Sequence, residues 1–106
     1  MFCIRIVAVP MFHVVLRQSG PEFDPALPLE QQSGIAEHAA YLNQLVDEGH
    51  IVLGGILPNL RTVHAIEAES EEQVRELWSR DPWYESHLIL ESIEPWDIRL
   101  DARRPD

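Results

Sequence analysis

The stretch HIVLGGILPNLRTVHAIEA, residues 50–68, contains two strand-like runs joined by a short connection. Residues 50–57 form a continuous apolar run, which predicts a strand covered on both faces. Residues 58–60 make a tight connection, and residues 61–68 return as the next strand. The pair Gly54-Gly55 predicts a bulge, or the close approach of another group to the backbone. Two neighbouring strands are therefore predicted at the centre of the chain.

A helix is predicted on each side of these two strands. From Ser33 to about Glu48, apolar residues recur at spacings of three and four, which is the pattern of one buried helix face. Gly49 supplies the end of this helix. The second helix begins at Ser70 with a capping-box spacing to Gln73, and runs through Trp78. It ends at Arg80-Asp81-Pro82, because proline disfavours a helical residue before it.

An outer strand is predicted near each end of the chain. Residues 12–18 alternate as a half-buried strand does, and residues 88–100 form a final strand that is interrupted at Pro95. Residues 19–34 contain three prolines and two glycines, which is typical of a long loop. The resulting order is βαββαβ, an α+β ferredoxin-like fold with an antiparallel sheet and both helices on one face.

This domain is expected to span residues 12–100. Residues 1–11 are interpreted as an N-terminal extension, and residues 101–106 as a flexible tail. The sheet face without helices still carries apolar residues, and 106 residues leave no further layer to cover it. We therefore expect a homodimer that packs through the helix-free sheet face.

Composition excludes several classes of function. The formal net charge is −10, so nucleic acids and anionic membranes are poor partners. All eight basic residues are arginines, which excludes Schiff-base chemistry on a lysine and a P-loop lysine. A single cysteine, Cys3, allows no intrachain disulfide, and no apolar run approaches the roughly 20 residues of a membrane helix. A soluble cytoplasmic protein is expected, with a small-molecule substrate and no nucleic-acid or membrane partner.

His38 and Asp81 are the candidate catalytic residues. His38 falls within the apolar stripe of the first helix, and Asp81 follows the inward side of the second helix. Both helices lie on the same sheet face in the predicted fold, so the two side chains can converge. An inward histidine needs a partner for its ring N–H, and an inward carboxylate needs donors. A carboxylate on one imidazole nitrogen orients the other nitrogen as a general base.

The segments EHAAYLNQLVDEGHIVLGG (37–55), EAES (67–70) and RDPWYESHLILESIEPW (80–96) resemble the YciI-like, or YCII-related, proteins. The resemblance runs from about Phe12 to Leu100. It implies a dimeric α+β barrel built from ferredoxin-like protomers, with a His–Asp site at His38 and Asp81. The few activities assigned in the family include dehydrochlorination of a chlorinated hydroxyquinol. The first ten residues and the loop 19–34 extend beyond the smallest members, and the loop can reshape the pocket.

Further polar residues are candidates for binding. Arg17 and Arg61 are suited to holding a substrate carboxylate bidentately. His13 lies on the same face of the first strand as Arg17, and is expected at the dimer interface or at the substrate. Trp83 is expected to be a core aromatic that also forms a wall of the pocket. His50 and His87 are expected at the surface.

Two strand histidines, His13 and His64, could bind a metal. No carboxylate completes a three-ligand set with them. We therefore expect neither a metal nor a cofactor.

Two functions remain open from the sequence. One is a cofactor-independent enzyme, a lyase or isomerase, in which the His–Asp pair acts on a small cyclic or aromatic acid. The other is a non-catalytic small-molecule binder or accessory protein, in which the pair is structural. A His38 nitrogen that faces a cavity favours the enzyme, whereas full burial favours the structural role.

Overall fold

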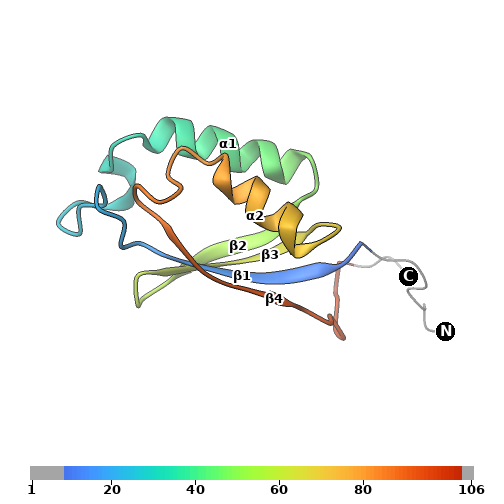
Figure 1. Cartoon of the computed structure of the whole chain (residues 1–106). Helices are drawn as coiled ribbons and strands as arrows, with labels where there is room; N and C mark the ends of the chain where they lie inside the picture. The colour runs from blue at the N-terminus through green and yellow to red at the C-terminus, as the bar shows by residue number, and fades with distance from the viewer. Residues whose placement is uncertain (1–8, 104–106) are drawn as a thin grey trace.

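The computed structural model describes residues 9–103, which form one antiparallel sheet with two helices over one of its faces (Figure 1). The strands are β1 (Met11–Arg17), β2 (Ile51–Leu57), β3 (Arg61–Glu67) and β4 (Ile89–Pro95). The helices are α1 (Ile35–Asp47) and α2 (Glu71–Ser79), and a 3-10 turn, η1 (Leu29–Gln31), lies in the long loop. The strand order is β2-β3-β1-β4, which confirms the predicted ferredoxin-like βαββαβ arrangement.

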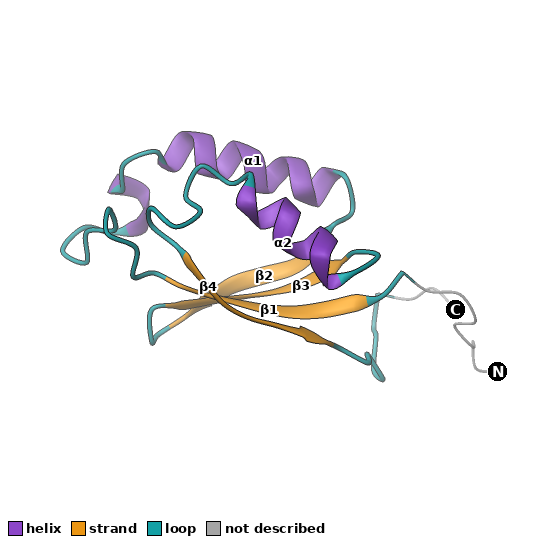
Figure 2. Ribbon diagram, viewed as in Figure 1, coloured by secondary structure: helices purple, strands orange, loops and turns teal. Residues whose placement is uncertain are grey.

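The sheet and the helices form two layers (Figure 2), and buried side chains from both layers make up a hydrophobic core. Its largest fully buried side chains come from β1, β3, both helices and the turn after α2: Val14, Leu16, Leu45, Ile66, Val74, Trp78 and Trp83. The core lies between the sheet and the helices, because alternate residues of β1 and β3 point to that side. The opposite sheet face has no covering element among residues 9–103.

The helix ends follow the local sequence signals. Gly49 has a φ of 84°, which a residue with a side chain adopts only with strain, and α1 stops just before it. Ser70 accepts a hydrogen bond from the Gln73 backbone N–H at 3.1 Å, and the Gln73 side chain accepts from the Glu69 N–H at 2.6 Å. Both predicted signals are confirmed. In a standard capping box the Gln73 side chain would accept from the N–H of Ser70 itself, but here it accepts from Glu69, the residue before it.

Two strand predictions were wrong in part. The strand 50–57 was expected to be covered on both faces, but β2 is an edge strand, and Leu53 is 72% exposed. The strand 88–100 ends at Pro95 instead of continuing to residue 100. Proline has no N–H to donate, so strand pairing ends naturally there. The first strand begins at Met11, one residue earlier than predicted.

The proposed N-terminal extension lies mostly outside the described residues, as does the end of the proposed tail. Within the described part, no helix has the length and apolar character needed to cross a membrane.

Candidate active site

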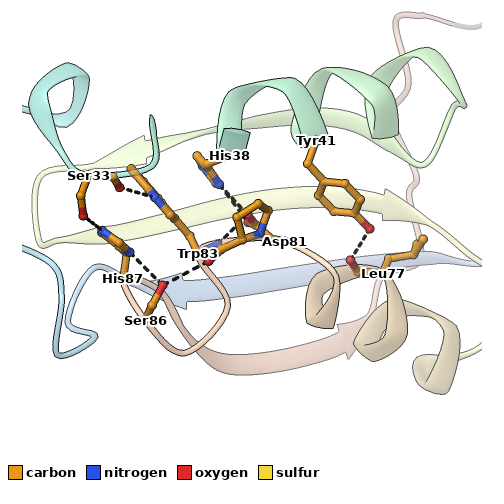
Figure 3. A network of polar contacts seen from close by, with 9 residues as sticks. Ser33, His38, Tyr41, Leu77, Asp81, Trp83, Ser86 and His87 are labelled. Carbon is orange, nitrogen blue, oxygen red and sulfur yellow. Dashed lines mark hydrogen bonds and ion pairs between the residues drawn. The ribbon is translucent and has the colours of Figure 1, made fainter. Parts of the chain in front are cut away.

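His38 and Asp81 form a buried pair beneath α1 (Figure 3). The Nδ1 atom of His38 lies 2.8 Å from one carboxylate oxygen of Asp81 and 2.9 Å from the other. Their side chains are 9% and 1% exposed. Because a carboxylate only accepts, Nδ1 carries the proton in this contact and donates it. The predicted pairing of the two residues is therefore confirmed.

The turn that carries Asp81 also fixes the carboxylate. After α2 ends, the backbone N–H of Trp83 donates to Asp81 Oδ1 at 3.0 Å, and the Tyr84 N–H donates to the Asp81 carbonyl at 2.9 Å. An aspartate that bonds its own backbone two residues later stabilises such a turn. One oxygen of Asp81 thus serves both the turn and the imidazole. The aspartate-proline-tryptophan sequence is a helix stop that also presents a charged acceptor to α1.

Trp83 holds the imidazole ring of His38 from one side. The two rings are stacked, with centroids 4.0 Å apart and an interplanar angle of 8°. The indole N–H of Trp83 donates to the Ser33 carbonyl at 2.8 Å, which fixes the ring against the start of α1. Trp83 is buried and contacts the cavity described below, so it is both the core aromatic and the wall that the sequence suggested.

His87 stacks on the other side of Trp83, with centroids 4.6 Å apart. Its two ring nitrogens are hydrogen-bonded to the Ser33 and Ser86 hydroxyls at 2.9 and 2.8 Å (Figure 3). The prediction that His87 is a surface residue was wrong, because this residue is only 3% exposed. The two serines satisfy both ring nitrogens, which allows the imidazole to be buried. His50 is half-buried, and its Nδ1 bonds the Glu67 carbonyl.

A cavity of about 260 Å³ lies between α1 and the sheet, and His38 is part of its wall. Val46 of α1 and Ile56 of β2 are its most exposed large side chains, so the opening lies between this helix and the edge strand. Thr62, His64 and Gly54 contribute the sheet side, and Trp78 and Trp83 close the inner end. Since Nδ1 of His38 is engaged by Asp81, Nε2 is the nitrogen left for a ligand.

The sheet side of the cavity contains two residues that the sequence did not place there. In the strand register, His64 of β3 pairs with Val14 of β1, and Thr62 pairs with Leu16. Directly opposed residues of antiparallel strands point to the same face, so both polar side chains face the helices. Burial, together with the nearby charge of His38, lowers the pKa of His64 to about 4.

The candidate binding residues on the strands lie away from the His38–Asp81 pair, on the helix-free face of the sheet. His13 lies in a separate hollow of about 270 Å³ on the helix-free face, together with Leu53, Val63 and Trp96. Arg17 is exposed, and Arg61 makes two hydrogen bonds to Glu91, at 2.7 and 3.0 Å. Neither arginine lines the cavity of His38. Their role in substrate binding, and that of His13, stays a prediction.

The strand register places the two histidines that were considered as metal ligands. His13 pairs with Ala65 and has its neighbours on the helix-free face, whereas His64 faces the helices. By this register the two histidines point to opposite faces of the sheet, although both contribute to the wall of the hollow on the helix-free face. Among residues 9–103, no group of three or more histidine, cysteine, aspartate or glutamate side chains is arranged to hold a metal.

The fold and the site define a class of protein, a small ferredoxin-like α+β domain with a buried His–Asp pair beside a cavity. The model of the YCII-related domain matches residues 11–97, and the chain belongs to this family. No similar chain was found among curated proteins or among solved structures.

Proposed function

We propose that this protein is a cofactor-independent enzyme in which His38 and Asp81 perform general acid/base chemistry. The reaction is an elimination or an isomerisation of a small cyclic or aromatic acid. Both reactions begin when a base removes a proton from carbon, and a neutral imidazole oriented by a carboxylate is suited to that step. The assignment of a lyase or isomerase goes beyond the family membership.

The observation that carries the proposal is the position of His38. Its Nδ1 is bound by Asp81, and the same side chain lines a cavity. The Asp81 contact selects the tautomer with a proton on Nδ1, which leaves Nε2 as the proton acceptor. Stacking on Trp83 prevents the ring from tilting away. The base is therefore oriented before a substrate arrives, which is what efficient proton transfer requires.

The cavity volume of about 260 Å³ limits the substrate to a small molecule. Typical ligand sites enclose roughly 300–1,000 Å³. A compound with one ring fits this size better than a nucleotide or a peptide.

Hydrogen–deuterium exchange tests the first chemical step without knowledge of the natural substrate. A panel of small cyclic keto acids and chlorinated lactone acids is incubated with the protein in D₂O, and loss of ring C–H signals is followed by NMR. We expect the wild-type protein to accelerate exchange in at least one compound. His38→Gln should slow that exchange by about 10²-fold or more, since a positioned base contributes roughly 10²–10⁴. His50→Gln, outside the cavity, is the matched control.

The near-complete burial of the pair supports a second candidate, a non-catalytic binder in which His38 and Asp81 join α1 to the turn after α2. The same panel separates the two. Under the second candidate, compounds raise the thermal stability of the protein by binding, but His38→Gln and the wild type give the same exchange rate.

We also propose the homodimer that packs through the helix-free sheet face. Leu53 and Trp96 are exposed at the hollow on that face, which would be covered by a second copy. Sedimentation at micromolar concentration should give twice the monomer mass, and Leu53→Glu should shift it toward the monomer. Leu27→Glu, in the long loop, is the control. A wild-type monomer at this concentration would contradict the proposal.

A further inference from the structure

The sheet side of the cavity contains two polar atoms with nothing to bond. Thr62 Oγ1 and His64 Nδ1 are buried and have no hydrogen-bond partner of normal geometry among the described residues. The Val14 backbone lies close enough to the His64 ring to raise its pKa, but burial lowers this pKa by more. Each of the two residues is only 8% exposed, and both line the cavity. An unpaired buried polar group is costly, so two on one wall are unusual in a well-packed domain. A ligand that supplies the missing partners would remove this penalty.

We propose that Thr62 and His64 form the polar floor of the cavity and hydrogen-bond the carbonyl oxygen of a ring substrate, while His38 removes a proton from the adjacent carbon. This assignment rests on the proposed function and narrows its substrate class to carbonyl compounds. Any carboxylate of the substrate lies away from the floor, toward the opening of the cavity.

The electrostatic state of His64 suits a neutral acceptor. Burial holds the pKa of His64 well below its ordinary value of 6.5, so the ring is uncharged at neutral pH. A neutral imidazole donates one hydrogen bond and carries no charge to pair with an anion. Thr62 adds a hydroxyl donor two residues away on the same face of β3. Two neutral donors favour a carbonyl over a carboxylate, whose charge would be left unpaired at the floor.

Gly54 makes room for this arrangement. It pairs directly with His64 across the β2–β3 ladder, and a Cβ at Gly54 would lie 2.5 Å from His64 Cδ2. A half-turn of the imidazole about its Cβ–Cγ bond exchanges Nδ1 with Cδ2, and the two orientations have nearly the same shape. In the turned orientation Nδ1 lies beside Gly54, which lines the cavity. The donor can therefore reach a ligand without moving the backbone.

The chemical step is balanced with these groups alone. Nε2 of His38 accepts the proton, and the C–H electron pair forms a new C=C bond as the carbonyl π pair moves to oxygen. The oxygen develops negative charge, which the hydrogen bonds from the floor stabilise. Where a second C=C bond is conjugated with the enolate, the carbonyl reforms, the electron pairs shift along the conjugated system, and the far carbon takes the proton back from His38, which is isomerisation. Alternatively the enolate restores the carbonyl and expels a leaving group with its bonding pair, which is elimination.

Paired probes test the floor without the natural substrate. Acetophenone carries a carbonyl and toluene does not, and the affinity of each is measured by NMR titration of the ¹⁵N-labelled protein. We expect acetophenone to bind wild type more tightly than toluene. His64→Phe should lower the affinity for acetophenone about tenfold, because the loss of one hydrogen bond leaves a buried carbonyl unpaired. The affinity for toluene should not change.

Three further variants make the result specific. His64→Gln keeps a neutral donor and should restore most of the acetophenone affinity. Thr62→Val keeps the shape but removes the hydroxyl, and should weaken acetophenone a few-fold without weakening toluene. His50→Phe, outside the cavity, should change neither. The inference is overturned if acetophenone binds no better than toluene, or if Thr62→Val and His64→Phe leave the difference between the two probes unchanged.

The two experiments distinguish failure of the floor assignment from failure of the proposed function. If His38 is not catalytic, the preference for acetophenone persists although deuterium exchange does not depend on His38. If the floor assignment is wrong, exchange still depends on His38 and the preference is absent.

Discussion

The cavity has two histidines in opposite situations. His38 has a carboxylate on Nδ1 and an indole stacked on its face, so its orientation is fixed before any ligand binds at Nε2. His64 is just as buried but has an unpaired Nδ1 and a pKa lowered to about 4. The difference shows that burial alone does not define the chemistry of a histidine. A carboxylate on Nδ1 makes one ring a base, whereas burial without a directly bonded carboxylate keeps the other ring neutral.

The His38–Asp81 pair should be more sensitive to substitution than the region around His64. Asp81→Ala removes the acceptor of both His38 and the Trp83 backbone N–H, so it leaves two buried donors without a partner. Breaking a buried pair in this way destabilises a protein by about 3–5 kcal/mol. Urea unfolding at pH 7 measures the loss, with Asp81→Asn as the shape-matched control. A decrease in unfolding free energy below about 1 kcal/mol would show that the Asp81 contacts contribute little to stability.

The unpaired ring predicts a loss of stability in acid. The folded protein holds the pKa of His64 at about 4, while the unfolded chain has the ordinary value of 6.5. Its contribution to stability is therefore complete above pH 6.5 and is lost as the pH falls toward 4. The full difference is on the order of 3 kcal/mol. Unfolding free energies of wild type and His64→Phe at pH 7 and pH 4.5 isolate it, since the variant should lose less stability in acid. Equal losses would show that His64 does not have a lowered pKa.

Gly54 should tolerate no side chain. In Gly54→Ala the new Cβ would meet His64 Cδ2 at 2.5 Å, so the His64 ring must leave its position. Such overpacking costs about 1–3 kcal/mol. Gly55→Ala is the matched control, because a Cβ there meets nothing within 4 Å. If both alanine variants have the same unfolding free energy, the close approach of His64 to the strand has no energetic role.

Thr62→Val should have the smallest effect and the opposite sign. The variant replaces an unpaired buried hydroxyl by a methyl group of the same shape, which removes a desolvation penalty. We expect the ligand-free protein to become more stable by up to about 1 kcal/mol in urea unfolding. A destabilisation of that size would show that the Thr62 hydroxyl already has a hydrogen-bond partner. It would contradict the contrast between the paired His38 and the unpaired groups on β3.

The sequence was sufficient for the fold and for the His38–Asp81 pair. The helix periodicity placed His38 inward, and Pro82 fixed where α2 ends, so both positions followed from local signals. The environment of His87 could not be predicted, because its partners Ser33 and Ser86 come from a loop and a turn without a periodic pattern.

The role of His64 was missed for a different reason. Apolar residues occur on both faces of β3, with Val63 and Ala65 on one and Ile66 on the other, so alternation did not show which face was buried. A signal was present in the hairpin, since a three-residue connection at 58–60 sets Gly54 opposite His64. A glycine facing a histidine across a ladder indicates that the ring lies over the neighbouring strand.

The tautomer and charge of the two rings test the account most directly. Two-dimensional ¹⁵N–¹H NMR of the imidazole nitrogens, recorded from pH 8 to pH 4.5, reports which nitrogen carries the proton. We predict that neutral His38 carries it on Nδ1, the nitrogen bound by Asp81, and that His64 stays neutral down to about pH 5. A neutral His38 with its proton on Nε2, or a His64 that becomes charged near its ordinary pKa of 6.5, would contradict the account.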